Sequence, residues 1–246
     1  MHEAINYDVI APVYAQTRAA APHVVAVLQQ AVTQLPPGAT IVELGCGTGN
    51  HLRALATSLP DYHYQGFDQS AEMLKVAAVA APTVTFHQGD AQLQWPLADQ
   101  SVDLVFNVDV IHYIKELPRF FAEARRVLRP GRTLVIATDA EADLRQRSLT
   151  LFFPEILAHE LARYPTAPAL DQAAADAGLT SGAPIHLERL SPISAADIDK
   201  LAAKCSSALR LISAEAHQRG LSRVRQAQAA GASWRSLYTI YSYTAP

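Results

Sequence analysis

One turn constrains the fold of this chain more than any other feature: the run ELGCGTG at residues 43–49. An apolar stretch precedes it, and a helical pattern follows it. Gly45, Gly47 and Gly49 permit positive φ angles and carry no Cβ atoms, so a ligand can approach the backbone closely. The helix that begins there also offers free N–H groups. A strand, a glycine-rich turn and a helix in this order predict a site for a nucleotide-like ligand.

Strands and helices are expected to alternate over the first 140 residues. Apolar runs bounded by Pro, Gly and polar turns predict strands at 40–44, 63–67, 83–87, 102–108 and 133–138. Helical spacing predicts helices at 51–59, 71–80 and from Pro118 to the stop at Arg129-Pro130-Gly131. Such alternation indicates an α/β fold with a parallel sheet that is covered by helices on both faces.

Polar residues follow several of the expected strands. Asp68 ends the second strand, 19 residues after Gly49, where a carboxylate can accept hydrogen bonds from both ribose hydroxyls. Gly89-Asp90-Ala91 follows the third strand, where a polar side chain and a backbone N–H can read an adenine edge. Glu43 lies at the end of an otherwise apolar strand and therefore needs a polar partner.

These motifs together resemble the class I S-adenosylmethionine-dependent methyltransferases, in their small-molecule branch. The resemblance covers about residues 5–140 and the last strand. The matching segments are Glu43–Gly49, Phe67–Ser70 with Met73, Gln88–Ala91, Asp103–Phe106 running into Ile111–Ile114, and Leu128–Arg132, where Arg132 replaces a common second glycine. The start, Tyr7-Asp8, Ala11, Tyr14 and Arg18, is similar to the family's N-terminal cap.

The resemblance implies a Rossmann-like, doubly wound, seven-stranded sheet in the order 3-2-1-4-5-7-6, with strand seven antiparallel. We place strand seven at 236–243 and the preceding strand at 184–190. The cofactor implied is S-adenosylmethionine, converted to S-adenosylhomocysteine, without a metal. The residues implied to bind it are Tyr14, Arg18, Glu43, Gly45, Cys46, Gly47, Gly49, Asp68, Gln69, Ser70, Met73, Asp90, Ala91 and Asn107. Among them, Asp68 holds the ribose and Asp90 with Ala91 the adenine.

Two segments exceed what the bare fold needs, and we expect them to form helical lids over an acceptor pocket. They are residues 141–168 and 194–233 in a single domain that spans 1–246. Its core is 22–140, 169–193 and 234–246, and its N-terminal cap is 1–21. Extra core helices are the alternative interpretation. The substrate-binding candidates are Tyr7, Tyr113, Phe152, Phe153, Arg163 and Tyr164.

Methyl transfer requires the acceptor atom to be aligned with the methyl group and the leaving sulfur, so positioning supplies much of the acceleration. A base is needed only where the nucleophile carries a proton. His112, just after the fourth strand, is the candidate for that base; a positioning or packing role is the equal alternative. Neither a Cys/His ligand pattern for a metal nor a Gly-x-Ser-x-Gly elbow occurs.

Composition and motif spacing argue against several other functions. The net charge of −3 gives no reason to expect nucleic acid or an anionic membrane as a partner, and 194–235 carries a local charge of +4 without an RNA-binding motif. The glycine spacing differs from the G-x-G-x-x-G of dinucleotide oxidoreductases. Two distant cysteines and the lack of a signal peptide favour the cytoplasm. We expect a small-molecule O- or N-methyltransferase, monomeric or homodimeric. A non-catalytic cofactor-binding protein and an RNA methyltransferase are the alternatives.

Overall fold

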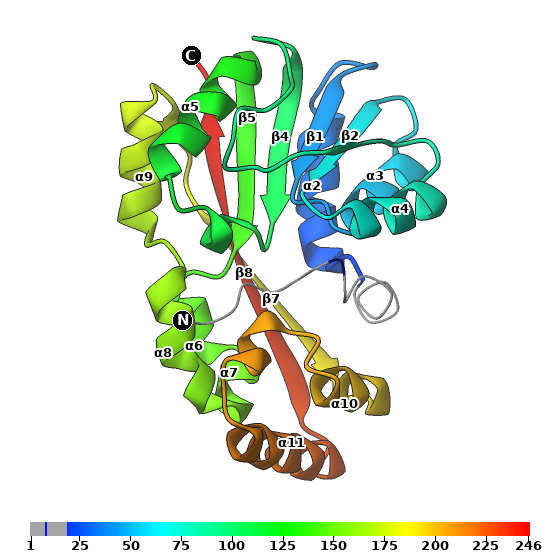
Figure 1. Cartoon of the computed structure of the whole chain (residues 1–246), viewed down its shortest axis with the longest axis vertical. Helices are drawn as coiled ribbons and strands as arrows, with labels where there is room; N and C mark the ends of the chain where they lie inside the picture. The colour runs from blue at the N-terminus through cyan, green and yellow to red at the C-terminus, as the bar shows by residue number, and fades with distance from the viewer. Residues whose placement is uncertain (1–7, 9–18) are drawn as a thin grey trace.

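The computed structural model describes residue 8 and residues 19–246, and its centre is one twisted sheet (Figure 1). The strand order is β3-β2-β1-β4-β5-β8-β6, and β7 also pairs with β8. The strands are β1 (Thr40–Leu44), β2 (His63–Asp68), β3 (Thr85–Gln88), β4 (Val102–Val108), β5 (Leu128–Thr138), β6 (Thr180–Ser181), β7 (Ile185–Pro192) and β8 (Ser233–Thr244). The neighbours among β1 to β5 run parallel, and β8 runs antiparallel to β5, β6 and β7.

This topology confirms the expected fold class, with β8 in the place of strand seven. The strand expected at 184–190 is β7, which begins one residue later and extends to Pro192. A short additional strand, β6, precedes it, and Gly182-Ala183-Pro184 separates the two pieces, because proline has no N–H to donate to a ladder. β8 pairs with both pieces, so it is longer than the expected 236–243 and begins at Ser233.

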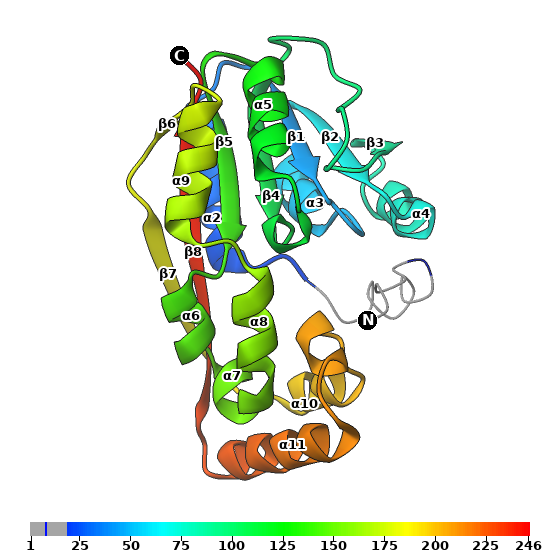
Figure 2. The same ribbon diagram turned by 60° about the vertical axis from the view of Figure 1, so that its left-hand side comes forward.

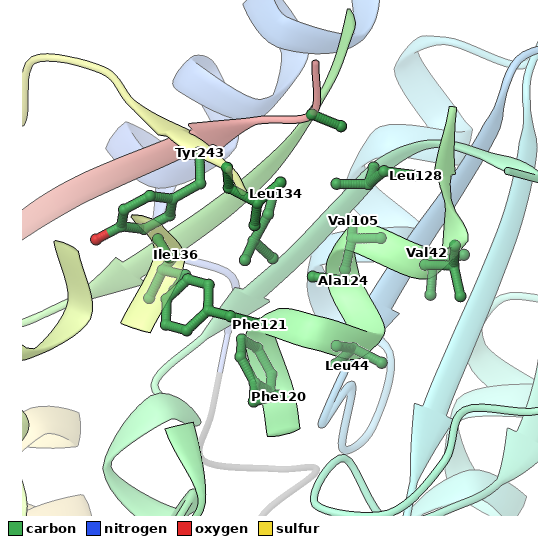
Figure 3. Packing of buried hydrophobic residues seen from close by; sticks show 14 of the residues in the cluster. Val42, Leu44, Val105, Phe120, Phe121, Ala124, Leu128, Leu134, Ile136 and Tyr243 are labelled. Atoms are coloured by element: carbon green, nitrogen blue, oxygen red, sulfur yellow. The ribbon is translucent and has the colours of Figure 1, made fainter. Parts of the chain in front are cut away.

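Helices cover both faces of the sheet. The helices around it are α2 (Pro22–Thr33), α3 (Asn50–Ser58), α4 (Ala71–Ala80), α5 (Leu117–Val127) and α9 (Ala167–Asp176). One apolar core joins the sheet to α5 and α9, and Figure 3 shows Phe121 of α5 packed near Tyr243 and Ile136. The other core joins the sheet to α2 and α3. Every residue of β4 is buried, as expected for a central parallel strand.

The expected turn at Arg129-Pro130-Gly131 is instead part of β5. The strand begins directly after α5, and its register with β4 shifts between Val102 and Leu104. Gly131 takes a φ of 72° there. Arg129 and Arg132 both pair with the buried carboxylate of Asp103, which also accepts a hydrogen bond from the Thr40 amide at 3.0 Å. Arg132, at the position where the resemblance implies a second glycine, therefore helps to neutralise a buried charge.

A second group of helices gathers around the beginning of β8 (Figures 1 and 2). It comprises α6 (Glu141–Gln146), α7 (Ser148–Phe152), α8 (Leu157–Arg163), α10 (Ala195–Ala202), α11 (Ala214–Ala229) and the short helices η2 (Pro154–Ile156) and η3 (Ser207–Arg210). These helices bury a core of their own, which includes Ile198, Leu201, Ala208, Leu209 and Ile212. The carboxyl end of β4 points toward this group (Figure 1).

Gly220 allows α11 to pack closely against Phe153. A Cβ atom on Gly220 would overlap the Phe153 ring, which is fully buried. We expect Gly220→Ala to lower the free energy of unfolding by about 1–3 kcal/mol, despite alanine's better helix propensity. Urea denaturation measures this change, with Ser222→Ala on the exposed face of α11 as the matched control. A Gly220→Ala protein as stable as the unchanged chain would contradict this packing.

Candidate functional site

The first of two adjoining cavities lies at the carboxyl ends of β1, β2 and β4; we call it the glycine-turn cavity. Gly45, Gly47 and Gly49 in the turn after β1 have φ angles of 68°, 52° and 72°. The turn is held in place because the Cys46 amide donates to the Phe67 carbonyl at 3.0 Å. A Cβ atom on Gly45 would overlap the Val110 side chain. The positive φ angles are as the sequence predicts, and close packing against Val110 is a further reason for glycine at position 45.

Asp68 faces this turn from the end of β2. Its Oδ2 accepts from the Gly47 amide at 2.8 Å and its Oδ1 accepts from the Ser70 amide at 2.9 Å. Burial raises the pKa of Asp68, and the backbone hydrogen bonds act against this rise. Because a carboxylate oxygen can accept more than one hydrogen bond, both oxygens keep capacity for further donors.

Glu43 has found the polar partner that its buried position demanded. Its side chain is 2% exposed, and its Oε1 lies 3.2 Å from Nδ1 of His51 on α3. Burial raises the pKa of Glu43. Burial also acts to lower the pKa of His51, but the hydrogen bond and the charge of Glu43 outweigh it and raise that pKa. Glu43 Oε2 and His51 Nε2 have no hydrogen-bond partner among the described residues.

The glycine-turn cavity is acidic. The ionisable carboxyl groups among its described lining residues are Glu43, Asp68, Asp90 and Asp109, and none of those lining residues is a lysine or an arginine. The cavity therefore favours a ligand that carries positive charge and disfavours one that carries phosphate groups.

The structure brings most of the predicted cofactor residues together here. Those that line the glycine-turn cavity are Glu43, Gly45, Cys46, Gly47, Asp68, Gln69, Met73, Asp90 and Ala91. Gly49, Ser70 and Asn107 do not line it. Gly49 is instead the N-cap of α3, and the Ser70 hydroxyl caps α4 by accepting from the Met73 amide. Tyr14 and Arg18 lie outside the described residues.

Asn107 corrects the expectation that it meets the ligand. It lies inside β4 with no exposed surface, and neither atom of its amide group has a hydrogen-bond partner among the described residues. The chain reaches the cavity one residue later, with Val108, Asp109 and Val110. β4 ends at Val108, as expected, so Asn107 is still inside the strand.

The second cavity, of about 360 Å³, lies between the sheet edge and the second group of helices; we call it the arginine cavity. Asp109, Tyr113 and Tyr238 line both cavities, so the two adjoin at these residues. Asp109 has a φ of 58°, which is strained for a residue other than glycine, and the Tyr238 hydroxyl donates to it at 2.8 Å. Sequence reasoning missed both residues, although Asp109 directly follows the apolar run of β4.

His112 lines the arginine cavity between two tyrosine rings. Its ring stacks on Tyr164 at 4.3 Å between centroids and lies 4.2 Å from the Tyr113 ring. Its Nδ1 is buried without a hydrogen-bond partner among the described residues. Burial, together with the charges of Arg163 and Arg147, holds the pKa of His112 well below its ordinary value. The ring is therefore neutral at pH 7 and available to accept a proton or a hydrogen bond.

A buried ionic network forms the wall beside His112. Arg147 pairs with Asp139 and Glu160, and Arg163 pairs with the same Glu160 and donates to the Ser207 hydroxyl at 2.9 Å. The Arg163 guanidinium also lies 5.6 Å from the centroids of Tyr113 and Tyr164. Burial raises the pKa of Asp139 to about 7, against the charge of Arg147. This network fixes the two arginines at the cavity wall.

Of the predicted substrate residues, Tyr113, Arg163 and Tyr164 line the arginine cavity. Phe152 and Phe153 line neither cavity, which corrects the expectation for them. Phe153 has no exposed surface and stacks on His217, whereas Phe152 stacks on Trp234. Both rings belong to the core of the second helix group. For this aromatic pair, the alternative interpretation of extra core helices therefore applies. Tyr7 lies outside the described residues.

Two features are absent from the described part of the chain. Across residues 8 and 19–246, no three His, Cys, Asp or Glu side chains are grouped so that they could hold a metal ion. In the same residues, none of the helices combines the length and the apolar character needed to cross a membrane.

Comparison with known proteins gave a family match in the amino-terminal half of the sheet. Residues 42–136 match the family model described as "Methyltransferase domain". The trans-aconitate 2-methyltransferase of Azoarcus sp. (strain BH72) is 39% identical over 102 residues, which are 42% of this chain and 40% of that enzyme. The chain thus spans only about two fifths of the length of the curated relatives that it matches.

Solved structures share the fold over most of the chain. A putative methyltransferase from an antibiotic biosynthesis pathway of Anabaena variabilis aligns with a TM-score of 0.70 at 21% identity, over 94% of this chain and all of that one. Geranyl diphosphate C-methyltransferase from Streptomyces coelicolor, in complex with S-adenosylhomocysteine, aligns with a TM-score of 0.58 at 17% identity, over 90% of this chain and 78% of that one. Residues 42–136 therefore resemble a methyltransferase domain, and the chain shares its Rossmann-like fold with these solved structures.

Proposed function

We propose that this protein transfers a methyl group from S-adenosylmethionine to an oxygen or nitrogen atom of a small molecule. The observation that carries the proposal is the junction of two unlike cavities at Asp109, Tyr113 and Tyr238. A methyl donor in the glycine-turn cavity would meet an acceptor in the arginine cavity at that junction. In-line displacement needs that arrangement, because the donor carbon and the acceptor atom must be held in contact.

The glycine-turn cavity suits this cofactor by its charge. S-Adenosylmethionine is cationic at its sulfonium and carries no phosphate, and the described lining offers carboxylates without lysine or arginine. A dinucleotide carries a pyrophosphate, which four carboxylates would repel. The sulfonium supplies an electrophilic methyl group, so the protein is left with binding, alignment and the exclusion of water.

We assign roles to the chain's own residues as follows. The spare acceptor capacity of Asp68 would take the two ribose hydroxyls, and Asp90 with the Ala91 amide would take the adenine edge. The open backbone at Gly45 and Gly47 would border the amino acid part. His112 would accept a proton from the acceptor or position it, because its ring is held neutral at the cavity wall.

The relatives support a small acceptor without naming it. By their names, the Azoarcus enzyme methylates trans-aconitate and the Streptomyces enzyme methylates geranyl diphosphate, and both are small molecules. The family model covers residues 42–136, which contain the glycine-turn motifs but not the arginines of the second cavity. The acceptor therefore has to be inferred from that cavity. A cytoplasmic location and a monomeric or homodimeric state remain part of this proposal.

Titration of the protein with S-adenosylhomocysteine tests the cofactor assignment. We expect Asp68→Asn to weaken binding about 10- to 100-fold, because a carboxylate that accepts from the cofactor and from two amides becomes an amide with one acceptor atom. Asp61→Asn, in an exposed turn, is the matched control and should bind normally. Equal dissociation constants for both variants would remove Asp68 from the ribose role.

Methyl transfer from labelled S-adenosylmethionine into a metabolite extract tests the reaction. Label in a small-molecule fraction, resistant to nuclease, would support the proposed enzyme. A protein that binds S-adenosylhomocysteine but transfers no label would be a non-catalytic cofactor-binding protein. Label in RNA would replace the small-molecule acceptor with a nucleic acid.

A further inference from the structure

The lining of the arginine cavity is rich in cationic side chains. The described lining residues include six cations, which are Arg147, Arg163, Arg189, Lys200, Arg210 and Arg235. The carboxylates in the same lining are Asp109, Asp139, Glu160 and Asp197. The cavity therefore carries an excess of positive charge.

Four of these cations are already paired. Arg147 and Arg163 share Glu160, Lys200 lies 4.0 Å from Asp197, and Arg235 forms a salt bridge with Glu188 at 2.9 Å. Arg189 on β7 and Arg210 at the end of η3 are exposed and have no ion-pair partner among the described residues. These two guanidinium groups supply the unmatched charge.

Arg147 offers the cavity a third hydrogen-bond donor. The Nε of Arg147 is buried at the cavity wall without a hydrogen-bond partner among the described residues, although its two terminal nitrogens are paired. A guanidinium is a rigid fork of N–H donors that matches a planar carboxylate. Arg147 lies between α6 and α7, Arg189 on β7 and Arg210 in η3, and all three line this one cavity.

We propose that the acceptor of this enzyme is a small carboxylate, held in the arginine cavity through Arg189 and Arg210. The inference rests on the proposed function, and it adds the chemical class of the substrate. The division of charge supports it: the glycine-turn cavity offers carboxylates to a cationic donor, and the adjoining cavity offers arginines to an anionic acceptor. A bound sulfonium at the junction would further favour an anionic neighbour.

The strand register limits the size of the acceptor. Tyr238, at the junction, pairs with Leu187 of β7, and Arg189 pairs with Ser236, two residues along β8. Two residues of a strand span about 7 Å. The backbone that carries Arg189 therefore begins about 7 Å beyond the junction, and its side chain lies on the same face of the ladder as that of Tyr238. A molecule of only a few carbon atoms can meet Arg189 with one end and the junction with the other.

Binding of small probes to the protein saturated with S-adenosylhomocysteine tests this class. The probes are glutarate, tricarballylate and benzoate, each compared with its neutral amide by isothermal titration. We expect at least one acid to bind about tenfold more tightly than its amide, and its affinity to fall at high salt. Arg189→Ala and Arg210→Ala should each weaken that acid about 3- to 10-fold. Arg225→Ala, an exposed arginine of α11 outside both cavities, should leave its affinity unchanged.

Other outcomes would overturn the inference. It fails if S-adenosylhomocysteine binds while no acid binds more tightly than its amide, or if Arg225→Ala weakens the acid as much as the two cavity variants do. Tighter binding of phenyl phosphate than of benzoate would replace the carboxylate with a phosphate ester. Failure of S-adenosylhomocysteine itself to bind would instead count against the proposed function, so the two failures are distinguishable in one set of samples.

Discussion

Gly47→Val is expected to abolish measurable binding of S-adenosylhomocysteine by a chain that still folds. Gly47 has a φ of 52°, which a β-branched residue tolerates poorly, and it lines the glycine-turn cavity. Its amide also donates to Asp68 at 2.8 Å, so a displaced turn would disturb the proposed ribose ligand as well. We expect a loss of at least about 100-fold in affinity, or about 2.7 kcal/mol. Calorimetric titration measures it, and circular dichroism verifies the fold.

Gly38→Val is the control that separates two effects of valine at Gly47: backbone strain and obstruction of the cavity. Gly38 has a φ of 76°, lies before β1 outside the cavity, and a Cβ atom there would meet nothing within 4 Å. Valine at this position should cost about 1–3 kcal/mol of stability, as it should at Gly47, but should leave cofactor binding intact. Normal binding by Gly47→Val would mean that the cofactor lies elsewhere.

The first half of the fold could be predicted because its signals are local. β1, β4 and α4 occur at the expected residues, and strands β2 and β3 differ from expectation by at most two residues at either end. Apolar periodicity and turn residues decide these elements within windows of about ten positions. The same reasoning predicted a turn at Arg129-Pro130-Gly131, where the structure has strand β5. These residues lie at an irregularity in the pairing of β5 with β4, and such a bulge has the same composition as a turn.

The glycine-turn cavity could be predicted for the same reason. Gly45, Gly47 and Asp68 belong to short motifs, and their backbone contacts follow from one strand–turn–helix unit. The arginine cavity could not be predicted in the same way. Arg147 and Arg189 lie far apart in the sequence, and only the tertiary fold brings them to one cavity. Sequence alone gave a local excess of positive charge, with no indication of which arginines face inward.

Aromatic residues show most directly what could not be predicted from the sequence. Tyr164 and Phe153 lie eleven residues apart in one segment, and both were expected to meet the substrate. Tyr164 stacks on His112 at the cavity, but Phe153 is buried against Gly220 and His217. Core packing and substrate stacking use the same residue types, so composition does not separate them. Which ring faces the cavity depends on helix packing between segments that are about 60 residues apart.

His112→Asn is expected to lower kcat about 100-fold and to change the dissociation constant of S-adenosylhomocysteine less than twofold. A positioned proton acceptor contributes about that factor, and His112 lines the arginine cavity but not the glycine-turn cavity. The assay uses labelled S-adenosylmethionine and the acceptor found by the transfer experiment. His63→Asn, on the exposed start of β2, is the matched control and should retain full activity.

The pH dependence of kcat distinguishes a base from a positioning ring. Only neutral His112 can accept a proton, and burial with the charges of Arg163 and Arg147 disfavours its cationic form. Its pKa is therefore depressed, so activity should stay constant down to pH 6.5 and fall only at lower pH. In His112→Asn the remaining slow rate should lack this fall. His112→Phe keeps a flat ring beside Tyr164: if it retains most of the activity, stacking is the role of His112 and the acceptor needs no base, as for a carboxylate oxygen that is itself methylated.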